Sequence, residues 1–107
     1  MPRYAVWAVD HPGRLADRER VREAHRARLR APAPHQVVVQ LAGPLLGGPD
    51  GAMDGTLLVV DAPDMAAVRR FVADDPYSLA GVYATVDIRR WRCGLGPLAE
   101  PPPGDET

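Results

Sequence analysis

The sequence of 107 residues lacks several features that mark large classes of proteins. Cysteine occurs once, at Cys93, so no disulfide can form within the chain, and we expect a reducing, cytoplasmic location. Lysine is absent, and the 13 arginines are offset by 14 acidic residues, which gives a formal net charge of −1. Without an excess of positive charge there is no electrostatic basis for a nucleic-acid partner.

Long apolar runs and the common cofactor motifs are missing too. No stretch reaches the roughly 20 apolar residues that span a bilayer, and no signal peptide is visible, so we expect no membrane partner. His11, His25 and His35 are too far apart in the sequence for the spacing of zinc ligands. No glycine-rich phosphate-binding motif follows a predicted strand. The sequence therefore predicts neither a metal nor another cofactor.

The residues that are present indicate one small folded domain. Hydrophobic residues make up 46% of the chain and charged residues 25%, which is an ordinary globular composition. A chain of 107 residues is long enough for one core but not for two. From Gly94 onward the sequence is rich in proline, glycine and acidic residues. We therefore assign residues 1–93 to an α+β domain and expect residues 94–107 to form a flexible tail.

The predicted elements follow the order β-α-β-β-α-β. Alternating or β-branched segments predict four strands, at residues 3–9, 35–42, 56–61 and 83–91. Helical periodicity predicts one helix at residues 14–31 and a second that begins after its N-cap, Asp64, and ends before Pro76, with a turn at residues 77–82. This order is that of the ferredoxin-like fold, an antiparallel sheet with both helices on one face.

The sheet face opposite the helices has no predicted cover within the chain. The run Val37-Val38-Val39 is apolar on both sides of its strand, since neighbouring side chains of a strand point to opposite faces. A small chain with such a strand most simply hides its second face against another copy. We therefore predict a homodimer in which the two sheets face each other.

The helix predicted at residues 14–31 carries polar groups on its apolar side. At about 100° per residue, an arc of roughly 120° holds His25, Arg18 and Arg22 among apolar side chains, whereas Arg26 and Arg30 point elsewhere. A buried polar group without a partner costs about 1–3 kcal/mol, so these groups require partners. His25 is therefore the first candidate for a functional residue. The alternative is a structural histidine that is satisfied by a backbone carbonyl.

Short motifs along residues 4–91 resemble those of the YCII-related (YciI-like) family. They are Asp10-x-Pro12-Gly13, Arg18-x3-Arg22-x2-His25, Ala42-Gly43-Pro44-Leu45, Gly55-Thr56, Asp75-Pro76-Tyr77, Ala80-Gly81-Val82 and Ile88-Arg89-Arg90-Trp91. The resemblance implies a dimeric α+β barrel and a site built from His25 and Asp75. A few members are linked to the breakdown of aromatic compounds, including dehydrochlorination. Thr56 departs from the family, in which serine is common at this position.

Elementary chemistry supports His25 and Asp75 as a catalytic pair. Imidazole, with an unperturbed pKa of about 6.5, exchanges protons near neutral pH, and a carboxylate on one ring nitrogen fixes the tautomer. Asp75 precedes Pro76 at a helix end, where its side chain could instead form only an Asx turn. Arg18 and Arg22 are candidates to bind an anionic group of a ligand, although Arg18 could instead pair with an acidic group across the dimer.

Four more residues complete the predicted ligand-binding set. Gly43 and Pro44, at a strand end, allow the backbone to approach a ligand closely. Thr56 offers a hydroxyl group, and Tyr77 either lines the pocket or packs in the core.

Two classes of function fit these residues. The first is a cofactor-independent lyase or isomerase, in which His25 and Asp75 perform acid/base chemistry on a small cyclic or aromatic metabolite. Elimination or isomerisation suits such a site, because each step requires only proton transfer. The second is a non-catalytic homodimer that binds a small ligand, or serves as an accessory subunit, through the same pocket. The two differ in whether the bound molecule is turned over.

Overall fold

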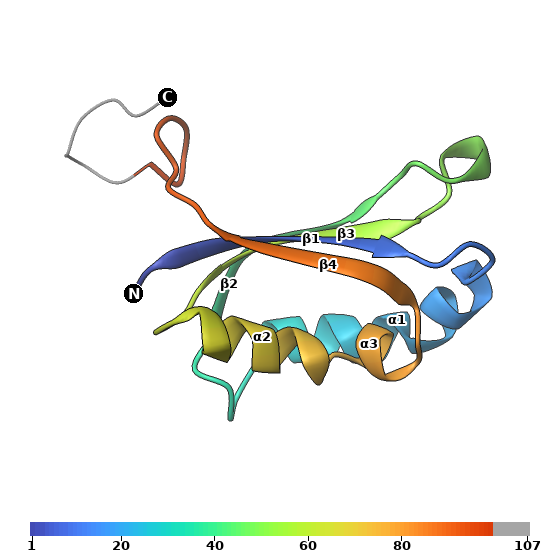
Figure 1. Ribbon diagram of the computed structural model, residues 1–107, viewed down its shortest axis with the longest axis horizontal. Helices are drawn as coiled ribbons and strands as arrows, with labels where there is room; N and C mark the ends of the chain where they lie inside the picture. Colours follow the sequence, from blue (N-terminus) through green and yellow to red (C-terminus); the bar gives the residue numbers. More distant parts are fainter. Residues whose placement is uncertain (100–107) are drawn as a thin grey trace.

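Four strands and three α-helices form in residues 1–99, the part of the chain that the computed structural model describes (Figure 1). In chain order they are β1 (Arg3–Asp10), α1 (Leu15–Arg30), β2 (Val38–Leu45), β3 (Gly55–Asp61), α2 (Met65–Ala73), α3 (Pro76–Leu79) and β4 (Tyr83–Arg90). A short 3₁₀ helix, η1 (Pro49–Gly51), lies between β2 and β3. The predicted order is confirmed with one addition, because the helix α3 stands where we expected only a turn.

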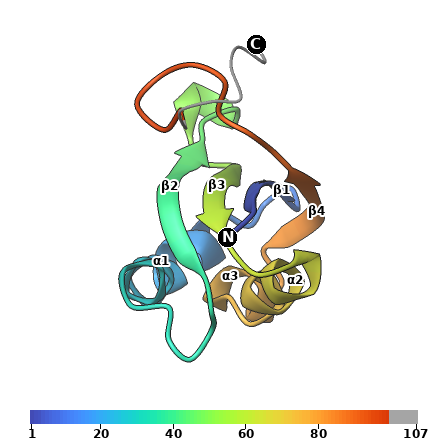
Figure 2. The ribbon, with the colours of Figure 1, turned by 90° about the vertical axis from the view of Figure 1, so that its left-hand side faces the viewer.

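The sheet has the strand order β2-β3-β1-β4, and each neighbouring pair is antiparallel. The helices lie together on one face of the sheet, with α1 on the side of β2 and α2 on the side of β4 (Figure 2). This is the ferredoxin-like α+β fold, the fold of dimeric α+β barrels, as the sequence predicts. Within residues 1–99 no helix is both long enough and apolar enough to cross a membrane.

The core lies between the helices and the inner face of the sheet. Tyr4, Val6 and Ala8 alternate along β1 and are all buried, as the period of two predicts. Val68 and Phe71, three residues apart on α2, bury their side chains against this layer. The alternation of the strand and the periodicity of the helix therefore account for the centre of the core.

A bulge in β2 decides which of its side chains face the helices. The pairing between β2 and β3 skips Gln40, whose side-chain amide donates a hydrogen bond to Asp61 Oδ2 at 2.8 Å. The alternation of side chains therefore changes sides at this residue. Beyond the bulge, Ala42 and Pro44 face α1, whereas Leu41 belongs to the outer face of the sheet.

The beginning of β2 differs from the prediction. The backbone N–H of His35 donates to the carbonyl of Pro32 at 3.0 Å, so this segment closes a turn and the strand starts only at Val38. Within the single chain Val37 is buried but Val38 is exposed. The segment Val37–Val39, which we expected to be buried on both faces of its strand, is therefore only partly buried within a single chain.

The outer face of the sheet, opposite the helices, carries exposed apolar side chains on three strands, whereas the edge strand β4 contributes Asp87 opposite Trp7. Trp7 of β1 is 51% exposed and Leu41 of β2 is 52% exposed. Leu57 of β3 is also exposed and pairs directly with Trp7 in the ladder. The exposed apolar side chains thus extend over three neighbouring strands.

The segment after β4 contacts the sheet through its backbone. Arg3 Nη1 of β1 donates to the carbonyl of Leu98 at 3.0 Å. Within the segment itself, the thiol of the buried Cys93 lies 3.1 Å from the carbonyl of Leu95. The flexible tail expected at residues 94–107 stays a prediction, and its residues 100–107 lie outside the described part of the chain.

The N-cap of α2 allows a test of this local structure. Asp64 Oδ1 accepts a hydrogen bond from the Ala67 N–H at 2.8 Å, as predicted for an N-cap. We expect Asp64→Ala to lower the free energy of unfolding by about 1 kcal/mol in urea denaturation, because this N–H loses its acceptor. Asp64→Ser keeps an acceptor and should remain close to the unchanged protein. Equal losses in the two variants would contradict the capping role.

Candidate functional site

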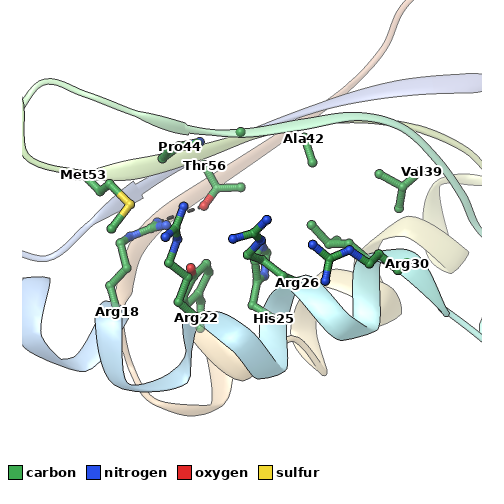
Figure 3. Close-up of a pocket in the computed structure, with 13 residues that line it drawn as sticks. Arg18, Arg22, His25, Arg26, Arg30, Val39, Ala42, Pro44, Met53 and Thr56 are labelled. Atoms are coloured by element: carbon green, nitrogen blue, oxygen red, sulfur yellow. Dashed lines mark hydrogen bonds between the residues drawn. The ribbon is translucent and has the colours of Figure 1, made fainter.

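A cavity of about 570 Å³ lies between α1 and β2 (Figure 3). Polar side chains of α1 form one wall, and small apolar side chains of β2 form much of the opposite wall. Seven predicted site residues line it: Arg18, Arg22, His25, Gly43, Pro44, Thr56 and Tyr77. The eighth, Asp75, contacts His25 from behind the wall. The cavity has a volume typical of small-molecule sites.

The structure brings His25 and Asp75 into direct contact. The Nδ1 atom of His25 lies 2.7 Å from Oδ2 and 2.9 Å from Oδ1 of Asp75. His25 is only 5% exposed and Asp75 only 2%. An ionised carboxylate accepts hydrogen bonds but donates none, so Nδ1 carries the hydrogen and the neutral ring keeps its lone pair on Nε2. The alternative partner, a backbone carbonyl, is not the group that binds His25 Nδ1.

Asp75 serves two purposes through one carboxylate. Its Oδ1 also accepts a hydrogen bond from the backbone N–H of Tyr77 at 2.8 Å, which caps α3. The local turn and the contact with His25, which the sequence offered as alternatives, therefore coexist. Because the cap fixes the carboxylate against the backbone, the imidazole meets an acceptor whose position is already determined.

Tyr77 fixes the plane of the imidazole. The rings of His25 and Tyr77 stack with their centroids 4.1 Å apart and an angle of 26° between their planes. Arg18 also contacts the Tyr77 ring, with its Cζ 4.2 Å from the centroid. Burial raises the pKa of the Tyr77 phenol, so the side chain stays neutral near physiological pH. Tyr77 therefore both packs in the core and lines the cavity.

Arg18 is neutralised within its own chain. Its Nε donates to Asp10 Oδ2 at 2.7 Å, and its Nη2 donates to Asp10 Oδ1 and to Thr56 Oγ1, each at 2.8 Å. Burial by itself disfavours the charged guanidinium, but the hydrogen bonds to Asp10 outweigh it and raise the pKa of Arg18. The acidic partner of Arg18 belongs to β1 of the same chain, so Arg18 does not need the acidic group across a dimer that the sequence left open.

The cationic surface of the cavity comes from three other arginines of α1. Arg22 and Arg30 make no hydrogen bond or ion pair with any residue in the range 1–99, and Arg26 has a 3.6 Å contact with the exposed Glu23. Arg26 and Arg30, which we expected to point away, line the cavity (Figure 3). Steps of four residues turn a helical position by only about 40°, which a long arginine side chain spans. The spacing of four residues from Arg22 to Arg26 and from Arg26 to Arg30 is the sequence signal that could have placed these two arginines at the cavity.

Arg28, which the sequence did not indicate as a site residue, is a neighbour of the His25–Asp75 pair. Its Nη1 lies 3.7 Å from Asp75 Oδ2, and its Cζ lies 4.2 Å from the centroid of the Phe71 ring. Both terminal nitrogens are buried and find no hydrogen-bond partner among residues 1–99. Asp75 thus lies between the imidazole of His25 and the guanidinium of Arg28. Across the same residues no cluster of three or more acidic, histidine or cysteine side chains is arranged to hold a metal ion.

The buried ion pair of the site should dominate local stability. We expect Asp10→Ala to lower the free energy of unfolding by about 3–5 kcal/mol, because it leaves the buried guanidinium of Arg18 without its counter-charge. Asp17→Ala is the control, since it removes the same group from a solvent-accessible pair with Arg14 at the start of α1. Urea denaturation should show a large shift of the midpoint for the first variant and almost none for the second. A similar small shift in both would contradict this account of Arg18.

Solved structures that are similar to this chain include an enzyme with a bound ligand. This is 5-chloro-2-hydroxyhydroquinone dehydrochlorinase from Burkholderia phenoliruptrix AC1100 in complex with 2,5-dihydroxybenzoquinone. The chain is 32% identical to it, with a TM-score of 0.75, over 86% of this chain and 95% of that one. The C-terminal domain of the MgtC protein from Mycobacterium tuberculosis has a TM-score of 0.55 at 18% identity over 85% of this chain and 88% of that one, and shows the fold alone.

Sequence relatives agree with the structural match. An uncharacterized protein of Haemophilus influenzae strain Rd is 32% identical over 100 residues, which cover 83% of this chain and 95% of that protein. The family model of the YCII-related domain matches residues 2–92, from before β1 to just beyond β4. The chain therefore belongs to the YCII-related family.

Proposed function

We propose that the cavity is the active site of a cofactor-independent enzyme in which His25 transfers protons on a small cyclic or aromatic metabolite. One observation carries the proposal: a buried imidazole bound by Asp75 at 2.7 Å forms part of the wall of a cavity of about 570 Å³. A histidine oriented by a carboxylate is a common arrangement of a general acid/base. Elimination or isomerisation is the class of reaction that such a pair performs without further groups.

The chemistry follows from the two ring nitrogens. Asp75 holds the hydrogen on Nδ1, so Nε2 accepts a proton from the substrate, and the imidazolium that forms lies against the ionised Asp75. In an elimination, the electron pair of the broken bond to hydrogen forms a double bond, and a leaving group departs with its own bonding pair. In an isomerisation, the same proton returns to a different atom. Arg22, beside the imidazole on the cavity wall, stabilises an anionic oxygen of the substrate.

Two features support a ring-shaped substrate. The apolar wall of β2, with Val39, Ala42 and Pro44, offers a surface for a flat apolar body opposite the arginines. The related dehydrochlorinase from Burkholderia is named for a substituted hydroquinone and contains a substituted quinone in its structure. We therefore choose 5-chloro-2-hydroxyhydroquinone as the assay substrate and 2,5-dihydroxybenzoquinone as the binding probe.

The acid/base role predicts a specific loss of turnover. We expect chloride release from 5-chloro-2-hydroxyhydroquinone to fall about 100-fold or more in His25→Gln, with the fold verified by circular dichroism. Asp75→Asn should also lower the rate, because the amide does not enforce the same tautomer. His11→Gln, the same substitution at an exposed histidine outside the cavity, is the control. Undiminished turnover in His25→Gln would exclude acid/base catalysis by this residue.

Chloride release and thermal melting together separate an enzyme from the non-catalytic alternative. A ligand-binding homodimer should show a higher melting temperature with 2,5-dihydroxybenzoquinone but no chloride release from the chlorinated compound. Such a protein should also keep its ligand affinity in His25→Gln as long as the glutamine preserves the hydrogen bond.

We also propose that a second copy of the chain covers the outer face of the sheet. Trp7, Leu41 and Leu57 form an apolar surface over three adjacent strands, and an exposed surface of this kind marks a contact with another molecule. The outer face is the one that the fold leaves free, because the helices occupy the other. A symmetric dimer buries the same patch on both copies.

The dimer is tested at the centre of this surface. Trp7→Glu should convert the protein into a monomer in size-exclusion chromatography with light scattering, because it places a charge among the apolar side chains. Leu79→Glu is the control, since Leu79 is more exposed but lies on α3, on the helical side. A monomeric unchanged protein, or a dimer that survives Trp7→Glu, would contradict the proposed interface.

A further inference from the structure

We propose that the cavity selects molecules with an apolar ring that carries two anionic groups about one helical turn apart. One group binds Arg22, next to the imidazole, and the second binds Arg26 and Arg30 farther along α1. The identity of the reaction rests on the function proposed above. The preference for two charges rests only on the arginines and on the shape of the cavity.

The first argument is the charge of the cavity wall. Of the four arginines that line it, only Arg18 has its charge cancelled, by Asp10 at 2.7 Å. Arg26 meets Glu23 only at 3.6 Å, with the Arg26 side chain 43% exposed and that of Glu23 80% exposed, and such surface contacts contribute little. No aspartate or glutamate among residues 1–99 lines the cavity. A ligand with a single anion would therefore leave most of the positive charge without a partner.

The second argument is spacing. Arg22, Arg26 and Arg30 follow one another at intervals of four residues, so successive positions rise by about 6 Å along the helix. Their side chains extend from α1 toward the sheet in one row (Figure 3). A guanidinium binds a carboxylate or a similar planar anion through two parallel N–H groups. Two planar anions at opposite ends of one ring match this row better than two that are adjacent.

The third argument is the opposite wall. Val39, Ala42 and Pro44 of β2 face the arginines and offer no charged group. A molecule between the two walls therefore has an apolar side against β2 and an anionic edge against α1. The bulge turns Ala42 and Pro44 toward the cavity. Because both side chains are small, the space between β2 and the arginines of α1 can hold a ring.

The test compares three probes of one chemical type by isothermal titration calorimetry at low ionic strength. They are benzoate, benzene-1,4-dicarboxylate and benzene-1,2-dicarboxylate. We expect the 1,4-isomer to bind at least about tenfold more tightly than benzoate, and also more tightly than the 1,2-isomer of equal charge. Arg26→Gln combined with Arg30→Gln should abolish the preference for the 1,4-isomer, so that the ratio of its affinity to that of benzoate falls to about one. Arg14→Gln combined with Arg20→Gln is the control, because it removes the same two charges from exposed side chains outside the cavity.

The outcomes separate this inference from the proposed function. Equal affinities for benzoate and the 1,4-isomer, or an undiminished preference in the double variant, would overturn the inference, and so would the absence of binding by all three. Equal affinities of the two dicarboxylates would overturn the spacing of the anions. The proposed function has a different readout, which is the loss of turnover expected in His25→Gln, whereas the preference for the 1,4-isomer is measured as binding alone.

Discussion

The site depends on one carboxylate that is held before any ligand arrives. Asp75 caps α3 through the Tyr77 N–H at 2.8 Å and accepts the His25 Nδ1–H at 2.7 Å. A carboxylate free to rotate would lose conformational entropy each time it oriented the imidazole, whereas a capping carboxylate has lost it on folding. The aromatic ring of Tyr77, two residues after Asp75, stacks on the imidazole of His25 and fixes its plane. Three consecutive residues, Asp75-Pro76-Tyr77, therefore determine both the tautomer and the orientation of a histidine fifty positions earlier.

The distribution of charge on α1 follows from what each arginine can reach. Arg18 lies against the inner face of the sheet. Its charge is balanced by Asp10, and Thr56 accepts a further hydrogen bond from it, so Arg18 supports the wall without attracting ligands strongly. Arg22 lies one turn later and has no such partner in the described part of the chain. Arg18 thus stabilises the fold, and the row of Arg22, Arg26 and Arg30 gives the cavity its positive potential. A buried charge without a partner is strongly destabilising. A half-exposed charge is solvated and screened by water, so it is stable without a partner until a ligand binds.

The sequence predicted the fold well because the fold follows from local patterns. Alternation placed Tyr4, Val6 and Ala8 in the core, and the capping preference of aspartate located the start of α2. His25 was found because an imidazole on an apolar helical arc requires a partner. The partner of Arg18 was not found, since Asp10 meets it only through the packing of β1 against α1. Arg28 was missed for the same reason, because nothing in its own helix indicates that it lies 3.7 Å from Asp75.

The bulge at Gln40 connects the cavity with the outer face of the sheet. With regular pairing, Leu41 would occupy the inward position and Ala42 the outward one, because a shift of one residue exchanges the two faces of a strand. A leucine side chain would then fill space that the small Ala42 leaves open, and the outer face would lose one of its most exposed apolar groups. Gln40 holds the bulge through its hydrogen bond to Asp61. One extra residue therefore provides both the room for a ring beside His25 and the apolar surface available to a second copy, and no periodicity in the sequence reveals it.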